Sequence, residues 1–326
     1  MTRPIVSICC VTYNHEKYIR QCLDGFVKQN TNFTFEILVH EDASTDKTAD
    51  IIKEYEVNYP HLFRCVYQSE NQFLKQNTLV NVLFKMAKGK YIALCEGDDY
   101  WTDPYKLQKQ IDFLEANPDY VACFHDVYHF HSQNNELVHS NIIVPVNYET
   151  PESIILNGNY IHTTSLIFRN ELKELPIEFS YSSIGDYFLQ VLLAERGLFK
   201  YLDERMAVYR LDSGIFNSKD YNYKQERILV FFMLLYNYYF SKNKKFSALV
   251  KKRIKQIIAD PYFDFEFQSI CAHLKSQPLL SFHAGVKMFF ASISIKISIL
   301  KIYRNKILGI YLFYKNKYSK KAFHFI

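Results

Sequence analysis

A chain of 326 residues with 48% hydrophobic residues is long enough to bury a substantial core, so we expect one large domain with an appendage. The net charge is +5, but residues 241–326 hold 17 Lys and Arg against 3 Asp and Glu, which leaves the rest of the chain acidic. The seven cysteines form no C-x-x-C pair and lie mostly in apolar runs, which indicates reduced core thiols and disfavours a zinc site. The sequence lacks G-x-x-x-x-G-K-[ST] and G-x-G-x-x-G motifs, which argues against ATPases and dehydrogenases. The basic residue Arg3 is followed at once by a strand-like run, so we expect no signal peptide.

Apolar runs alternate with helix-like segments through the first hundred residues. This alternation is typical of βαβ units and predicts an α/β fold with a parallel sheet. The strand-like runs are residues 5–11, 35–39, 62–67 and 91–95; the helix-like segments are residues 16–27, a stretch with Ala49, Ile51, Ile52 and Tyr55 as inward positions, and residues 79–87.

Three of the strand-like runs end in polar clusters, at residues 12–14, 41–46 and 96–99. Parallel strands place such ends at one edge of a sheet, where open α/β sheets bind ligands. The third cluster holds three carboxylates, those of Glu96, Asp98 and Asp99. Mg²⁺ or Mn²⁺ would relieve their repulsion and complete its shell with substrate phosphates. The cluster indicates metal-assisted chemistry on a phosphorylated substrate; the alternative is an acidic turn that caps a helix starting near Pro104.

The motifs of these regions resemble those of the family 2 glycosyltransferases, which are inverting enzymes with a GT-A fold. The resemblance rests on VSICCVTYN, EILVHEDASTDKT and GKYIALCEGDD, and it extends over residues 4–215. DDYWTDP followed by KLQKQ is similar to a common bacterial branch of the family. The resemblance implies a Rossmann-like, mostly parallel sheet flanked by helices, with a catalytic domain over residues 1–215.

The resemblance also implies a site for a nucleotide-sugar donor, which we expect to be UDP-linked. Residues 12–14 would border the nucleotide, and Asp42 would accept a hydrogen bond from the imide of the base. The alternative is structural, because Asn14 and Asp46 also suit helix caps and the second cluster suits a turn. The implied donor-binding residues are Thr12, Tyr13, Asn14, Glu41, Asp42, Ser44 and Asp98.

Metal binding is implied for the acidic turn. Asp99 would bind the Mg²⁺ or Mn²⁺ that bridges the donor diphosphate, and Asp98 would contact the ribose or help to hold the metal. That cation would stabilise the charge that develops on the departing nucleoside diphosphate.

A general base is implied near the start of a downstream helix. Asp186, in SSIGDYFL, fits this position, and a carboxylate there would take the proton of the acceptor hydroxyl. The alternative is a helix cap, since Gly-Asp before an apolar helix is an ordinary start signal, and the two roles are compatible.

The chain departs from the family after the strand-like run at residues 206–210. Asp212 stands where relatives have a histidine, so its role as a further metal ligand is in doubt. Arg210 could pair with the diphosphate or with a nearby acid. Trp101 and His162 are further candidates for the acceptor or diphosphate region, although a structural role for His162 is the stronger reading.

Residues 216–326 are expected to form a mostly helical, basic appendage. Apolar residues recur at three- and four-residue steps between 282 and 300, interspersed with lysines, which is typical of an interfacial helix on anionic lipid. Lys287 and Lys296 interrupt the stretch, so it is no clean transmembrane span. The alternative is packing on the catalytic domain or another helix, and we expect no nucleic-acid partner because no such motif is present.

Together these features predict an inverting glycosyltransferase of bacterial surface polysaccharide biosynthesis, such as capsule or O-antigen. Its acceptor would be a lipid-linked saccharide, and its place the cytoplasmic side of the membrane, bound peripherally. The alternatives are a nucleotidyltransferase on a related fold and a non-catalytic glycan-assembly protein. The sequence predicts neither the sugar, the linkage nor the oligomeric state.

Overall fold

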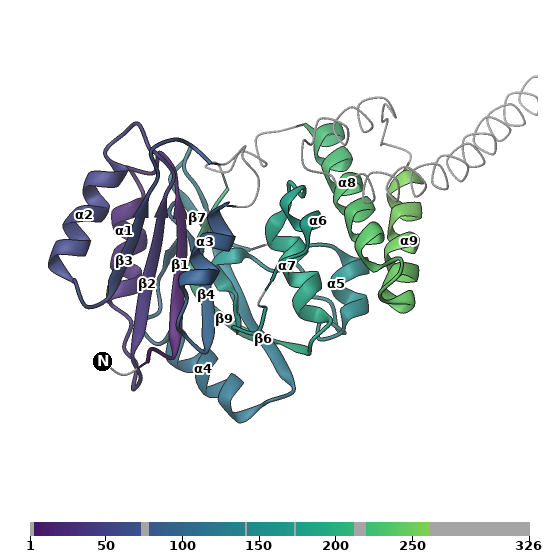
Figure 1. Ribbon diagram of the computed structural model, residues 1–326, viewed down its shortest axis with the longest axis horizontal. Coiled ribbons are helices and arrows are strands. Elements are labelled where there is room, and N and C mark those ends of the chain that lie inside the picture. Colours follow the sequence, from purple (N-terminus) through teal and green to yellow (C-terminus); the bar gives the residue numbers. More distant parts are fainter. Residues whose placement is uncertain (1–2, 73–77, 141, 173, 212–219, 261–326) are drawn as a thin grey trace, which may run out of the picture. The chain divides into compact units, whose positions relative to one another are not determined.

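The computed structural model describes residues 3–72, 78–140, 142–172, 174–211 and 220–260. The chain separates into one compact unit, Met1–Asp220, and a second unit that begins at Tyr221 (Figure 1). Asp212 and the amphipathic stretch after residue 282 lie outside the described residues, and the domain boundary expected near residue 215 stays a prediction.

The described strands of the first unit form one nine-stranded sheet in the order β3-β2-β1-β4-β8-β6-β9-β5, with β7 paired to β6. β1, β2, β3 and β4 run parallel, as the alternating pattern predicted, whereas β8 runs antiparallel to both of its neighbours. The strands are β1 (Val6–Thr12), β2 (Phe35–Glu41), β3 (Phe63–Tyr67), β4 (Tyr91–Glu96), β5 (Tyr100–Trp101), β6 (Tyr120–His131), β7 (Glu136–His139), β8 (Ile167–Arg169) and β9 (Leu198–Arg210).

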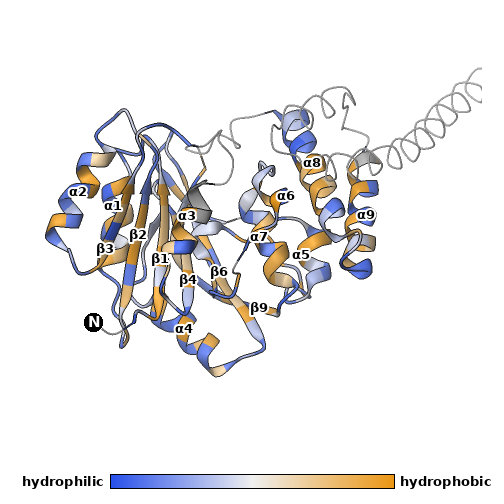
Figure 2. Ribbon diagram, in the orientation of Figure 1, coloured by the Kyte–Doolittle hydropathy of each residue, from blue (hydrophilic) through white to orange (hydrophobic). Residues whose placement is uncertain are grey.

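Helices cover the sheet, with α1 and α2 on one side of the parallel strands and α3 on the other (Figure 1). β1 is buried along nearly its whole length, as expected for a strand covered on both faces, and Figure 2 shows the central strands as mainly hydrophobic. The helices are α1 (Ile19–Val27), α2 (Thr48–Asn58), α3 (Thr78–Met86), α4 (Lys106–Ala116), α5 (Pro151–Asn157), the 3₁₀ turn η2 (Thr163–Ser165), α6 (Ile177–Ser180) and α7 (Gly185–Ala194).

Two elements differ from the sequence-based expectation. α1 begins at Ile19 rather than at Glu16. The residues before it form a loop, in which Asn14 takes a left-handed conformation (φ 55°) and the Glu16 N–H donates a hydrogen bond to Asp46 Oδ2. β9 starts eight residues before the expected Met206, since its exposed polar middle hides the strand pattern and its register against β6 shifts there.

The described part of the second unit is a pair of helices, α8 (Tyr221–Tyr239) and α9 (Lys244–Ile258). The side chain of Asn243 accepts a hydrogen bond from Phe246 N and caps α9, and the Phe246 ring lies 4.9 Å from that of Tyr239. Among the described helices, none has the length and apolar character needed to cross a lipid bilayer.

Candidate functional site

The parallel register brings the three polar clusters to one edge of the sheet. Thr12 on β1 pairs with Glu41 on β2, and Val11 pairs with Glu96 on β4. The predicted convergence is therefore confirmed, and it places the ends of β1, β2 and β4 side by side at the ligand-binding edge of an α/β sheet.

Asn14 and Ser44 tie the first two clusters together. Asn14 N donates to Ser44 Oγ (2.9 Å), and Thr45 N donates to Asn14 Oδ1 (2.8 Å). Glu41 accepts a hydrogen bond from Ser44 N at 2.7 Å and is buried. The side chains of Asn14, Glu41 and Ser44 thus stabilise the loops at this edge of the sheet through hydrogen bonds. Their contact with a sugar-nucleotide donor stays a prediction.

Asp42 and Tyr13 are next to the residues that form these hydrogen bonds between the two loops. Asp42 is buried, its N–H donates to Thr12 O (3.0 Å), and its Oδ1 accepts a hydrogen bond from Gln72 N (2.8 Å). Tyr13 is 40% exposed, so its ring is available to a ligand at this edge.

The first and third clusters approach so closely that Gly97 has no room for a side chain. A Cβ on Gly97 would lie 2.6 Å from Thr12 Oγ1 and 3.0 Å from His15 Nδ1. Thr12 is itself buried, with its Oγ1 3.2 Å from His15 Nδ1. Burial lowers the pKa of His15, which keeps this contact neutral near pH 7.

Asp99 presents an unpaired, buried carboxylate oxygen. Its Oδ1 accepts a hydrogen bond from Arg210 N (2.9 Å), whereas its Oδ2 is buried without a hydrogen-bond partner. Burial, together with the charges of Asp98 and Glu96, holds the pKa of Asp99 well above its usual range. An orphaned buried oxygen in an acidic cluster fits a bound cation.

Arg210 holds the turn that carries Asp98 and Asp99. Its guanidinium donates to the main-chain oxygen of Asp98 and to Gln21 Oε1, and it lies 4.7 Å from the ring centre of Tyr18. The side chain is 5% exposed. The structure thus gives Arg210 a positioning role at the acidic turn.

The charge of Asp186 acts on Glu96, although ninety residues separate the two in the chain. Burial, then Asp98, then Asp186 raise the pKa of Glu96 to about 8. Burial also raises the pKa of Asp186, against the opposing effect of Asn159, whose Nδ2 donates to Asp186 Oδ2 (3.0 Å). Asp186 lies in the first turn of α7, and its charge acts on Glu96 at the end of β4. Glu96 belongs to the site, and the sequence signal for it was its place among the three carboxylates.

The residues fit a divalent cation that has few protein ligands. No group of three His, Cys, Asp or Glu within the described ranges could hold a metal ion by itself. Mg²⁺ typically takes one or two carboxylates and completes its shell with water and substrate phosphates, and Asp99 with Asp98 can supply those carboxylates.

Two other candidates, Trp101 and His162, are engaged in contacts within the protein. Trp101 is 4% exposed, donates from Nε1 to Thr164 O (3.0 Å) and packs edge-to-face on Phe26, so it belongs to the core. His162 Nε2 lies 3.0 Å from His129 Nε2, and burial lowers the pKa of His162 to about 3. His162 thus has a partner and stays neutral.

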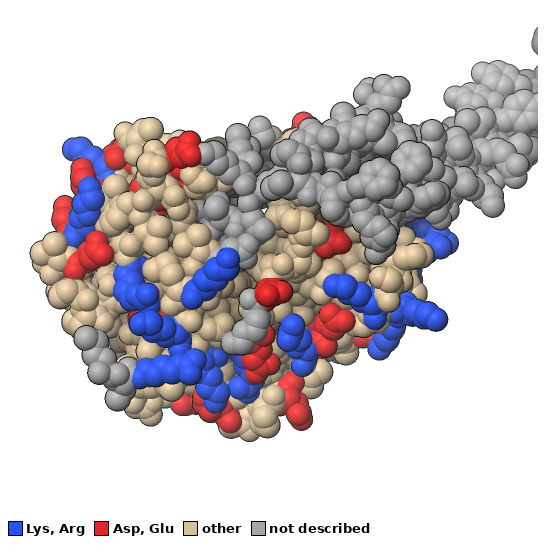
Figure 3. All heavy atoms as spheres, in the orientation of Figure 1, with Lys and Arg blue, Asp and Glu red and all other residues tan. Residues whose placement is uncertain are grey.

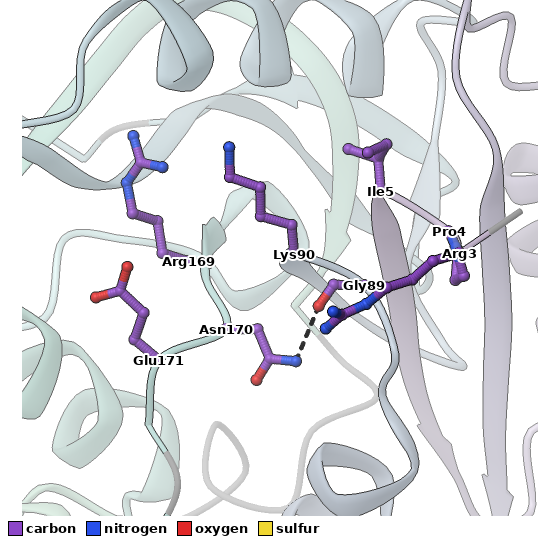
Figure 4. A pocket seen from close by; sticks show the side chains of 8 residues that line it. All are labelled: Arg3, Pro4, Ile5, Gly89, Lys90, Arg169, Asn170 and Glu171. Atoms are coloured by element: carbon purple, nitrogen blue, oxygen red, sulfur yellow. Dashed lines mark hydrogen bonds between the residues drawn. The ribbon is translucent and has the colours of Figure 1, made fainter.

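A pocket of about 370 Å³ lies at the opposite edge of the sheet, near the start of β1 and β4 (Figure 4). Its cationic side chains are engaged: Lys90 Nζ pairs with Glu115 (2.7 Å), and Arg169 donates to Tyr91 Oη (2.9 Å) and to main-chain oxygens. It lacks the acidic residues of the first edge.

Comparison with known proteins agrees with this architecture. The family model described as glycosyl transferase family 2 matches residues 7–183. The chain therefore belongs to glycosyl transferase family 2, and it has the GT-A fold that its motifs implied.

Among solved structures, S. aureus TarS 1–349 in complex with UDP shares the fold at 20% identity and a TM-score of 0.56, over 78% of this chain and 70% of that chain. The mannosyltransferase PcManGT of Pyrobaculum calidifontis, in complex with GDP-Man and Mn²⁺, shares it at 14% identity and a TM-score of 0.53, over 90% and 87%.

Two relatives are similar in sequence. An uncharacterised protein of Mycobacterium tuberculosis is 39% identical over 219 residues, which make up 65% of this chain and 61% of that protein. The E. coli glucosyltransferase WfaP, a UDP-Glc:α-D-GlcNAc-diphosphoundecaprenol β-1,3-glucosyltransferase, is 27% identical over 60% of this chain and 72% of its own length. The chain thus spans less than two thirds of the mycobacterial relative.

Proposed function

We propose that this protein is an inverting glycosyltransferase that moves a sugar from a UDP-linked donor to a hydroxyl group of a glycan acceptor. The observation that carries the proposal is the meeting of Asp42 with the turn of Asp98 and Asp99 at one edge of the sheet, with an unpaired buried oxygen on Asp99. The S. aureus structure supports the choice of a uridine nucleotide, because that fold neighbour holds UDP.

Asp99 would hold a Mg²⁺ or Mn²⁺ ion, with Asp98 as its second carboxylate or as a ribose contact. When bound, such a cation neutralises charge on the donor diphosphate and on the departing nucleoside diphosphate. The Mn²⁺ in the Pyrobaculum fold neighbour supports this part of the proposal. Arg210 keeps both carboxylates in place through its contacts with Asp98 O and, by its main-chain N–H, with Asp99 Oδ1.

Asp186 would act as the base. An acceptor oxygen forms a bond to the anomeric carbon as the bond from that carbon to the diphosphate breaks, and the hydroxyl proton passes to Asp186. The raised pKa of Asp186 makes its ionised form a stronger base, and Asn159 orients the carboxylate through Oδ2. Attack from the face opposite the leaving group inverts the anomeric configuration.

We further propose a lipid-linked saccharide as acceptor, in the assembly of a bacterial surface polysaccharide such as capsule or O-antigen. The support is the relative WfaP, whose printed acceptor is a GlcNAc-diphosphoundecaprenol. Such an acceptor would place the protein at the cytoplasmic face of the membrane, and the basic charge of residues 241–326 suits an anionic lipid surface.

Calorimetric titration of the full chain with UDP-, GDP-, dTDP- and CMP-sugars, with and without Mn²⁺, tests the donor site. We expect metal-dependent binding of the UDP-sugars, lost in Asp99→Asn and kept in Asp50→Asn, whose carboxylate is exposed on α2. Asp186→Asn should keep donor binding and lose roughly 10²- to 10⁴-fold in transfer rate to a saccharide acceptor. Binding that ignores both Mn²⁺ and Asp99, or transfer by Asp186→Asn at the normal rate, would contradict the proposal.

A further inference from the structure

One face of α9 carries only positively charged side chains among its charged residues. Its buried side chains, Phe246, Val250, Ile254 and Ile257, recur at three- and four-residue steps on the face turned towards α8. The helix contains no Asp or Glu. Figure 3 shows Lys and Arg side chains gathered at the part of the molecule that α9 occupies in this view.

Four exposed lysines of α9 fall into one stripe. At about 100° per residue, Lys244, Lys251, Lys252 and Lys255 lie within an arc of about 100°, opposite the buried face. At about 1.5 Å per residue the stripe is about 16 Å long. No ion pair is found for these four lysines in the described part of the chain.

A solvated helix surface in this protein looks different. On α2, exposed Lys53 lies 3.4 Å from Asp50, and Glu54 pairs with Arg20 at 2.7 Å, so both signs alternate. Like charges spaced four residues apart, as in Lys251 and Lys255, destabilise a helix slightly. An external anion would offset this repulsion on the α9 stripe, whereas the α2 surface balances its own charges.

We propose that the α9 stripe docks on the anionic headgroups of a lipid membrane. Lysines are compact, strongly hydrated charges that suit many headgroups rather than one bidentate ligand. The apolar residues of α9 are turned towards α8, so the contact is electrostatic and needs no insertion into the acyl region. The exposed stripe offers no aromatic ring on which a base could stack, which disfavours single-stranded nucleic acid. The inference rests on the membrane location proposed above and specifies α9 as a contact.

The test is co-sedimentation of the full chain with vesicles of phosphatidylcholine alone or with 30 mol% phosphatidylglycerol, at about 50 and about 500 mM salt. The variant changes Lys244, Lys251, Lys252 and Lys255 to Gln. The matched control changes four exposed lysines of the first unit to Gln, which alters the net charge equally: Lys17, Lys28, Lys53 and Lys85.

Each lysine near an anionic surface contributes about fivefold to partitioning, so the α9 variant should lose at least about tenfold even where other basic residues still bind. The control should keep most of the binding, and high salt should abolish it in the wild type. Wild-type-like binding by the α9 variant would overturn the inference while leaving the membrane location intact. Failure of the wild type to bind anionic vesicles, or stripe-dependent binding of polynucleotides alone, would overturn it too. UDP-sugar titration of the same variant keeps these outcomes separate from the donor site.

Discussion

Replacing Lys106 with methionine should make the stability of the protein less dependent on pH. Lys106 is fully buried in α4, where its Nζ donates to Gln110 Oε1 (2.8 Å) and lies 4.1 Å from the ring centre of Trp101. Burial lowers the pKa of Lys106 from 10.5 to about 7. The folded state therefore resists the charge that this side chain carries freely in the unfolded chain.

The sign follows from proton binding. Between pH 7 and pH 10.5 the unfolded chain holds a proton at Lys106 that the folded state lacks, so the contribution of Lys106 to the free energy of unfolding rises with pH. At 1.36 kcal/mol per pH unit, the charged lysine costs about 5 kcal/mol below pH 7 and about 1.4 kcal/mol at pH 9.5. Attraction to the Trp101 ring, of up to about 2 kcal/mol, reduces the larger figure.

Methionine has a similar length and no charge. It leaves Gln110 Oε1 without its donor, but that loss is the same at every pH and cancels in a comparison of two pH values. Lys106→Met should therefore stabilise the protein more at pH 6 than at pH 9.5, by between about 1 and 3 kcal/mol.

Urea denaturation at pH 6 and pH 9.5 measures this difference. Lys28→Met is the control, because Lys28 is 71% exposed and should show no such dependence. An equal change in unfolding free energy at both pH values, or a larger gain at pH 9.5, would refute the view that burial lowers the pKa of Lys106 in the folded state.

Two further substitutions test the close contacts around the site. Gly97→Ala would bring a Cβ to 2.6 Å from Thr12 Oγ1, so we expect a loss of about 1–3 kcal/mol in urea denaturation and weaker metal-dependent UDP binding in calorimetry; unchanged affinity would contradict the fit of the two loops. Trp101→Phe removes the donor to Thr164 O and leaves a buried carbonyl unpaired, which should cost about 1–3 kcal/mol of unfolding free energy, and a neutral result would mean that water replaces the indole N–H.

The edge of the sheet could be predicted because its causes are local. Apolar runs of five to seven residues mark β1, β2 and β4, and parallel pairing alone then requires residues 12, 41 and 96 to meet. The acidic turn after β4 is visible in the sequence for the same reason. Site residues that follow a buried strand are in this sense the easiest to find.

The core position of Trp101 depends on tertiary structure and could not be predicted from the sequence. It lies two residues after Asp99, which suggested a place in the site. Tyr100 and Trp101 instead form a two-residue strand against β9, and side chains alternate along a strand, so Trp101 turns into the core. A strand this short leaves no periodic signal.

Lys106 and Glu96 show the same limit in other ways. Lys106 and Gln110 lie one turn apart on the buried face of α4, where the lysine donates a hydrogen bond to the glutamine. Nothing in the sequence KLQKQ indicates that its first lysine is buried. The charge of Asp186 on α7 acts on Glu96 at the end of β4, and no spacing rule connects residues so far apart in the chain.

If the protein has the proposed function, the carboxylates at this edge of the sheet couple nucleotide binding to metal binding. Burial already raises the pKa values of Glu96, Asp99 and Asp186, which means that ionising them all at once is unfavourable. A diphosphate would add negative charge to the same edge, and the guanidinium of Arg210 is engaged with the Asp98 carbonyl and Gln21. A divalent cation held by Asp99 would offset both repulsions together. UDP and Mn²⁺ should therefore each raise the affinity of the protein for the other, because such a coupling is reciprocal.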